Sequence, residues 1–205
     1  MCGFSAGGHL CASLCTHYED IPDPIYGEVS NRPDAAVLAY PVITSGVHAH
    51  RESFVSLLGN APPQELLDYY SLEKQVTPQT PPCFLWQTMH DAIVPVENSR
   101  LYAEACRKQG VSYAHHIFTT GIHGMGLGNE AWAAGAYGSD YVEEQCAILT
   151  KLVRQGILRR PGRDGRELDR FDDAAARAAA KCGGKAFPEA AMWPEMADQW
   201  LKNIL

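Results

Sequence analysis

Short runs of apolar residues alternate along the first 120 positions with stretches in which apolar residues recur every three or four positions. The apolar runs lie at residues 1–4, 35–40 and 83–87, and residues 113–119 are expected to form a further strand. Uninterrupted runs of this length are typical of strands buried on both faces of a parallel sheet. The stretches with helical spacing lie at residues 6–14, 65–70 and 96–110. The alternation predicts an α/β fold in which helices cover a parallel sheet of about four strands.

Residues 129–190 follow a different pattern. They are rich in alanine, arginine and aspartate, and two glycine-containing turns separate two helical stretches, 141–155 and 166–181. The first stretch has an apolar face that should pack on the domain, and the second has little apolar area. We therefore expect one domain over residues 1–205 that carries a helical insertion at 129–190, which could serve as a lid. A last amphipathic helix is expected over 193–205.

Composition narrows the class of partner and the compartment. The chain has 205 residues, of which 46% are apolar, and a net charge of −7, which argues against nucleic acid or an anionic membrane as partner. Seven cysteines without paired spacing, and no leader-like start, predict a reducing, cytoplasmic setting. No apolar stretch approaches the roughly 20 residues that a membrane-spanning helix needs. The expected partner is a small molecule.

The first candidate for chemistry is Ser5, in Gly3-Phe4-Ser5-Ala6-Gly7. This segment matches G-x-S-x-G, the sharp turn from strand to helix that exposes a nucleophilic serine. The pattern alone is weak, because a glycine-flanked serine in a turn is common. The apolar run before it and the helical spacing after it are what the motif requires. In that geometry the backbone N–H of Ala6 would be one oxyanion donor, at a helix N-terminus that favours negative charge.

Two further candidates follow the later predicted strands. Asp91 comes just after the strand at 83–87, and His123 comes just after the strand at 113–119. A lone loop aspartate or histidine is more often structural, but Ser, Asp, His is the order that this kind of fold uses, at the carboxyl ends of strands. We therefore predict Ser5 as nucleophile, His123 as the base that takes its proton, and Asp91 as the residue that orients His123.

Five segments in order carry a family resemblance. They are Gly3 to Leu10, Arg32 to Ile43, Thr80 to Trp86, Val94 to Ser99, and His123 to Leu127. Together they resemble the bacterial α/β-hydrolase esterases described as acetyl-xylan-esterase-like or carbohydrate esterases. The resemblance covers residues 1 to about 127 and again 193–203. It implies Ser5, Asp91 and His123 as the triad, short acyl esters as substrates, and no metal or cofactor.

The chain also departs from that family. Family members place about half a sheet and a His-Gly-Gly-type loop, which supplies a second oxyanion N–H, before the serine motif. We therefore expect only the C-terminal part of an α/β-hydrolase fold, with weakened catalysis because one oxyanion donor is worth about 10²–10³ in turnover. The first strand, normally central, would become an exposed edge, so we expect self-association through it. In the family segment at 94–99, Glu97 and Asn98 are expected to cap and orient the helix that follows, and they are not assigned to the site.

Other functions also fit the sequence. A peptidase or a lactone hydrolase on the same fold would need the same three residues, because one scaffold hosts many substrates. A non-catalytic fragment of such a hydrolase is the alternative from another class. Metal binding by Cys11, Cys15 and His17, or by His48 and His50, is disfavoured, because the cysteines belong to a predicted core helix and neither set has a partner pair. His115 and His116 should face opposite sides of their strand.

Overall fold

The computed structural model describes residues 1–21, 29–136, 148, 151–152, 155–157 and 185–205. They belong to two compact units, one of residues 1–127 with 189–205 and one of residues 128–188. Within the second unit, helix α5 (Glu130–Ala133) begins where the Asn129 side chain accepts the N–H of Trp132 at 2.8 Å. The predicted helices at 141–155 and 166–181 lie largely or wholly outside the described residues.

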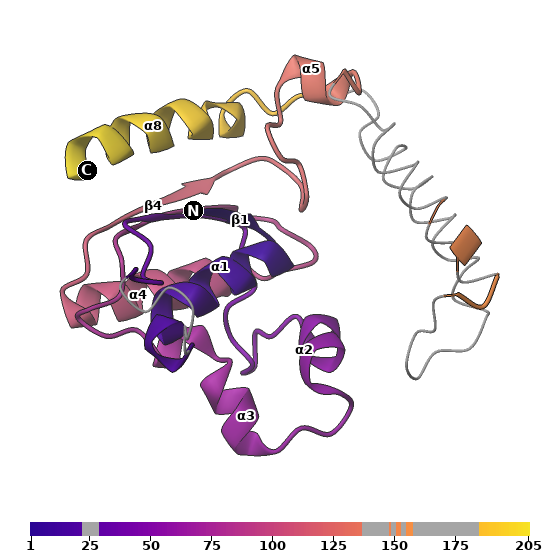
Figure 1. The fold of residues 1–205 in the computed structure, drawn as a ribbon. Coiled ribbons are helices and arrows are strands. Elements are labelled where there is room, and N and C mark those ends of the chain that lie inside the picture. Colours follow the sequence, from indigo (N-terminus) through magenta and orange to yellow (C-terminus); the bar gives the residue numbers. More distant parts are fainter. Residues whose placement is uncertain (22–28, 137–147, 149–150, 153–154, 158–184) are drawn as a thin grey trace. The chain divides into compact units, whose positions relative to one another are not determined.

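The first unit is built on a parallel sheet of four strands (Figure 1). The strands are β1 (Cys2–Phe4), β2 (Ala36–Ala39), β3 (Cys83–Thr88) and β4 (Tyr113–Phe118). They pair in chain order, with Gly3 beside Leu38, Leu38 beside Leu85, and Leu85 beside His115. Every residue of β2 and β3 is buried, because helices cover both faces. The predicted α/β class and strand number are confirmed.

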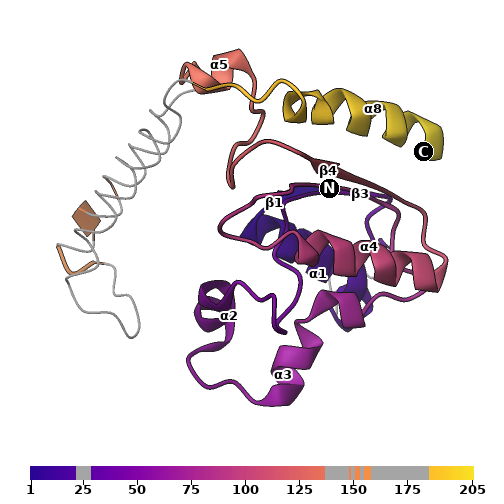
Figure 2. The same ribbon diagram turned by 180° about the vertical axis from the view of Figure 1, so that it is seen from behind.

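Helices lie on the two faces of this sheet. The helices of the first unit are α1 (Ala6–His17), α2 (Arg51–Leu58), α3 (Gln64–Tyr69), α4 (Glu97–Gln109) and α8 (Trp193–Ile204), with single 3-10 turns at Tyr18–Asp20, Leu72–Lys74 and Ala190–Met192. Helices α1 and α4 cover one face and α8 covers the other (Figures 1 and 2). No helix among the described residues has the length and apolar character needed to cross a bilayer.

Two cores hold the sheet between these layers. Toward α1 and α4, the fully buried residues include Ala12, Leu38, Leu85, Tyr102 and Cys106. Burying one such large side chain contributes about 1.5–3 kcal/mol. Toward α8, an aromatic cluster forms from Phe4, Tyr40, Trp86, Phe118 and Trp193, in which the Trp86 and Trp193 rings stack with centroids 5.3 Å apart. This second core ends at the carboxyl edge of the strands, where the predicted chemistry lies.

The predicted elements of the first unit agree with the structure within three residues at their ends. Gly110 ends α4 in the left-handed conformation, with φ of 70°, as its place after the helical pattern indicated. His115 and His116 do face opposite sides, since His115 contacts Ser99 of α4 and His116 packs on the Phe84 ring. Helix α2 was not predicted.

Candidate active site

Ser5 is the single residue between β1 and α1. Its backbone, with φ of 53° and ψ of −119°, is strained for a residue with a side chain. Hydrogen bonds hold it there: the Ser5 N–H donates to the Ala39 carbonyl at 3.0 Å, and the Ser5 carbonyl accepts the N–H of Val42 and of His9 at 3.2 Å. The sharp strand-to-helix turn that the glycine pattern predicted is present, and it presents Ser5 at the end of the strand.

Glycines allow this turn through two close contacts. A Cβ on Gly3 would lie 2.2 Å from the Gly7 carbonyl oxygen, and a Cβ on Gly8 would lie 2.8 Å from the Pro41 Cβ. By contrast, a Cβ on Gly7 would meet no described atom within 4 Å. The steric demand therefore falls on Gly3 and Gly8, and the last glycine of the G-x-S-x-G pattern is not required by packing in the described part of the chain.

The three predicted residues form one chain of hydrogen bonds. The Ser5 Oγ lies 2.7 Å from His123 Nε2, and the His123 Nδ1 lies 2.7 Å from Asp91 Oδ2. A carboxylate can only accept, so the proton between His123 and Asp91 sits on Nδ1. In neutral imidazole this leaves Nε2 as an acceptor for the Ser5 hydroxyl proton. The arrangement can deprotonate the serine and retain the proton on the histidine.

Backbone N–H groups hold the Asp91 carboxylate at the oxygen that does not face His123. Its side chain is fully buried, and its Oδ1 accepts the backbone N–H groups of Ile93 and Val94, both at 2.9 Å. A buried carboxylate is costly unless its oxygens are paired, and here one oxygen receives two N–H groups while the other receives His123. The loop after β3 thus holds the carboxylate with one oxygen aimed at the histidine.

The loop that carries His123 is packed as tightly as the serine turn. Gly121 has φ of 147°, and a Cβ there would lie 2.4 Å from Thr88 Cγ2, so only glycine fits against the end of β3. Two residues after His123, the Met125 side chain is fully buried and anchors the loop in the core. His123 itself is 15% exposed, which leaves its imidazole reachable for a substrate.

Two aromatic residues beside His123 were not predicted as part of the site. Tyr40, at the end of β2, packs its ring against the His123 imidazole with centroids 5.0 Å apart. Trp193, at the start of α8, donates from Nε1 to the Gly126 carbonyl at 2.9 Å. The sequence offered one signal, since Tyr40 falls in a segment of the family resemblance and Trp193 begins the last matching stretch.

The prediction that Glu97 and Asn98 cap α4 is wrong. Among the described residues, no side-chain hydrogen bond caps this helix, whose N-cap position is Val96. Instead, the buried Asn98 side chain accepts the N–H groups of Ile43 and Thr44 and donates to the carbonyls of His48 and Pro95. Asn98 therefore joins the loop after β2 to the loop that carries Asp91, and all of its hydrogen-bonding capacity is used in doing so.

The expected oxyanion donor stands at the first residue of α1. Ala6 is exposed, and the N–H groups of a first helical turn have no acceptor within their own helix. The positive end of the α1 dipole is therefore directed toward the space beside Ser5 Oγ, where charge would develop on a substrate carbonyl.

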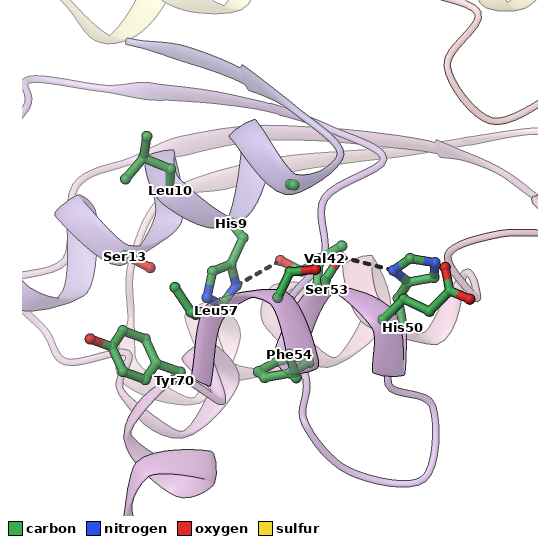
Figure 3. Close-up of a pocket in the computed structure, with 12 residues that line it drawn as sticks. His9, Leu10, Ser13, Val42, His50, Ser53, Phe54, Leu57 and Tyr70 are labelled. Atoms are coloured by element: carbon green, nitrogen blue, oxygen red, sulfur yellow. Dashed lines mark hydrogen bonds between the residues drawn. The ribbon is translucent and has the colours of Figure 1, made fainter. Parts of the chain in front are cut away.

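A cavity of about 650 Å³ is lined mainly by residues of α1 and α2, and Ala6 is one of them. Its walls are largely apolar and include Leu10, Val42, Phe54 and Leu57. Figure 3 shows His9 of α1 directed toward α2, with its Nδ1 bonded to the Val42 carbonyl at 3.2 Å. Burial lowers the pKa of His9, which keeps it neutral. The volume is typical of small-molecule sites.

The cysteine and histidine sets weighed for metal binding are occupied by other contacts. Cys11 and Cys15 lie in the core, and His17 stacks on Tyr69 and bonds its carbonyl at 3.1 Å. His50 bonds Ser53 at 2.8 Å. Within the described ranges, no three histidine, cysteine or acidic side chains gather as metal ligands would.

Comparison with known proteins identifies several relatives. The chain is 49% identical over 145 residues to endo-1,4-beta-xylanase B of Butyrivibrio fibrisolvens, a match to 70% of this chain and 23% of that protein. It is 32% identical over 131 residues to the acetylxylan esterase of Xylanibacter ruminicola, covering 62% of this chain and 25% of that protein. The chain thus spans about a quarter of the curated relatives that it matches.

A solved structure and a family model also match this chain. The acetyl ester-xyloside bifunctional hydrolase from Caldicellulosiruptor lactoaceticus superposes with a TM-score of 0.58 at 40% identity, covering 77% of this chain and 57% of that one. The model of the prolyl oligopeptidase family matches residues 1–146, which include β1 to β4 and all three residues of the hydrogen-bonded chain. The fold is that of the α/β-hydrolases, and this chain belongs to the prolyl oligopeptidase family.

Proposed function

We propose that the chain carries the active site of a serine ester hydrolase that acts on short acyl esters, such as acetylated carbohydrate. The observation that carries this proposal is the hydrogen-bonded chain from Ser5 through His123 to Asp91, with both links at 2.7 Å. Two relatives support the substrate class: one is an acetylxylan esterase and another an acetyl ester-xyloside hydrolase.

The geometry suggests how each residue would act. Ser5 Oγ attacks the ester carbonyl while its proton passes to His123 Nε2, and Asp91 stabilises the imidazolium that results. His123 then returns the proton to the leaving alcohol, which breaks the C–O bond and leaves an acyl group on Ser5. Water, deprotonated by the same histidine, hydrolyses that acyl-serine and regenerates the hydroxyl.

The surroundings of Ser5 suggest where the substrate lies. The Ala6 N–H would donate to the oxyanion of the tetrahedral intermediate. The cavity that Ala6 helps to line would receive one half of the ester, and its largely apolar wall suits an acyl group better than a charged one. We place the acyl half there, with the alcohol half toward solvent.

The test is hydrolysis of p-nitrophenyl acetate by the purified chain, with Ser5→Ala assayed beside it because other histidines give a background rate. We expect the wild type to exceed Ser5→Ala by orders of magnitude, since that variant has no nucleophile. A fluorophosphonate probe should label the wild type and leave Ser5→Ala unlabelled. Equal rates and no labelling would contradict the proposal.

A peptidase is the second candidate, because the family is that of the prolyl oligopeptidases. The same fold and the same three residues could catalyse peptide hydrolysis. The assay separates the two if a prolyl p-nitroanilide peptide is tested alongside the acetate ester. Ser5-dependent cleavage of the peptide without cleavage of the ester would replace the esterase by the peptidase.

A further inference from the structure

Tyr40 has a backbone conformation that a residue with a bulky side chain rarely adopts. Its φ is 36°. In the described part of the chain, Ser5 is the only other non-glycine residue with a positive φ. Strained backbone persists where the surrounding structure holds it, and it concentrates at functional sites. Tyr40 therefore shares with the nucleophile a feature that neither helix nor strand geometry explains.

Contacts on three sides hold this conformation. The Tyr40 N–H donates to the Trp86 carbonyl at 2.7 Å, which fixes the backbone at the end of β2. The ring packs edge-on against Trp86, with centroids 5.0 Å apart, and against Phe4 at 5.9 Å. Only 4% of Tyr40 is exposed. The strained turn thus places the side chain in one position under the carboxyl end of the sheet.

In that position the ring flanks the His123 imidazole. The two centroids are 5.0 Å apart and the ring planes meet at 63°, within the range of favourable aromatic pairs. The hydrogen bond that His123 Nε2 accepts from Ser5 and the one that Nδ1 donates to Asp91 fix the two imidazole nitrogens. They still allow rotation of the ring about the line that joins those nitrogens. Contact with a rigid neighbouring ring restricts that rotation.

The phenol of Tyr40 also reaches the loop that carries His123. The Gly126 N–H donates to the Tyr40 hydroxyl at 3.3 Å, while the Gly126 carbonyl accepts from Trp193 Nε1 at 2.9 Å. Gly126 is thus held on both sides by aromatic side chains. Burial raises the pKa of Tyr40 to about 12, so the hydroxyl is neutral and available as an acceptor over the working range of an esterase.

We propose that Tyr40 is a positioning residue for His123: its ring sets the tilt of the imidazole, and its hydroxyl, together with Trp193, anchors the loop at Gly126. This inference rests on the proposed function for its kinetic consequences, but the contacts themselves are independent of any substrate. In this proposal, Tyr40 at the strained end of β2 keeps His123 aligned between Ser5 and Asp91.

The matched control is Tyr102. This residue is also a buried tyrosine, but it belongs to the core toward α1 and α4, a cluster that includes none of the three residues of the triad. Replacing either tyrosine by leucine removes a similar buried ring. A purely structural role would make Tyr40→Leu and Tyr102→Leu alike, whereas a positioning role predicts that only Tyr40→Leu changes the environment of His123.

The experiment combines steady-state kinetics with NMR of ¹⁵N-histidine-labelled protein, in which His123→Gln identifies the resonance of the His123 Nδ1 proton. We expect Tyr40→Leu to lower kcat by about 10²-fold, as misalignment of a reacting group does, with KM within about twofold, and to broaden or shift that resonance. We expect Tyr40→Phe, which keeps the ring, to lose about two- to threefold, the effect of one neutral hydrogen bond. Tyr102→Leu should change neither quantity in the folded protein.

The NMR arm separates this inference from the proposed function. If the wild-type chain hydrolyses no ester, the proposed function fails, and the His123 resonance still decides the role of Tyr40. An unchanged resonance and kcat in Tyr40→Leu would overturn the inference. If that variant does not fold, the double variant Tyr40→Phe with Trp193→Phe tests the anchoring of the loop, because it keeps an aromatic ring at each position and removes both hydrogen bonds to Gly126. A sharp, unshifted resonance there would overturn the anchoring role of the Tyr40 hydroxyl and Trp193.

Discussion

Replacing Asp91 by asparagine tests the tautomer on which the proposed mechanism depends. The substitution keeps the size and shape of the side chain but turns one acceptor oxygen into a donor NH₂. The structure determines which way the amide must point. Because the N–H groups of Ile93 and Val94 both need an acceptor at the Oδ1 position, the amide oxygen is held there and the NH₂ is directed at His123 Nδ1.

The expected loss follows from that orientation. A donor facing Nδ1 requires Nδ1 to be unprotonated, which moves the imidazole proton to Nε2, the atom that lies 2.7 Å from Ser5 Oγ. A protonated Nε2 cannot take the serine proton. The same change in a serine protease triad costs about 10⁴ in turnover, which corresponds to about 5.4 kcal/mol of transition-state stabilisation. The fold should lose far less, about 1 kcal/mol, because the bonds to Ile93 and Val94 remain.

The assay is kcat/KM for p-nitrophenyl acetate in the wild type, Asp91→Asn, Asp91→Ala and Ser5→Ala, with urea unfolding of each. If the wild type lies less than 10⁴-fold above the Ser5→Ala background, the rate of fluorophosphonate labelling replaces turnover as the readout, since both use the same proton transfer. An Asp91→Asn variant that folds normally and retains activity within about tenfold of the wild type would refute the reasoning, because one tautomer step of about 10⁴ would be missing.

Two further predictions concern stability. Gly3→Ala should lower the free energy of unfolding, measured by urea denaturation, by about 3 kcal/mol, because its Cβ would lie 2.2 Å from the Gly7 carbonyl oxygen. Gly7→Ala, with no described atom near its Cβ, should change the free energy of unfolding by less than about 1 kcal/mol. Equal effects of the two substitutions would contradict this assignment. Burial, with smaller contributions from His116 and Arg100, lowers the pKa of His115 to about 4, below its value of about 6.5 in the unfolded chain. The unfolded state therefore binds the proton first. The difference between the two pKa values corresponds to about 3.4 kcal/mol, which solvent screening of this half-buried side chain reduces to about 2 kcal/mol. This stability, present above pH 6.5, should be lost between about pH 6.5 and 4; His115→Gln should flatten that part of the stability curve, and an unchanged curve would exclude His115 as its source.

Much of the sheet could be predicted because its two central strands are largely apolar. A strand buried on both faces has few polar positions to obscure it, so β2 and β3 are visible as runs in the sequence. Helix α2 was missed for the opposite reason. Only Phe54 of its eight residues is buried, so its sequence carries almost no helical pattern, and its place against the cavity comes from tertiary packing.

The sequence also allowed the prediction that Ser5, Asp91 and His123 lie close together. Each follows a strand, and parallel strands end at the same edge of the sheet. What could not be predicted is how the site is held. Tyr40, Trp193 and Asn98 act through contacts with loops that are 50 or more positions away in the sequence. A tyrosine that ends an apolar run is indistinguishable, in sequence, from one more core residue. Its difference lies in a positive φ, a property of the folded backbone that no pattern of hydrophobic and polar residues encodes.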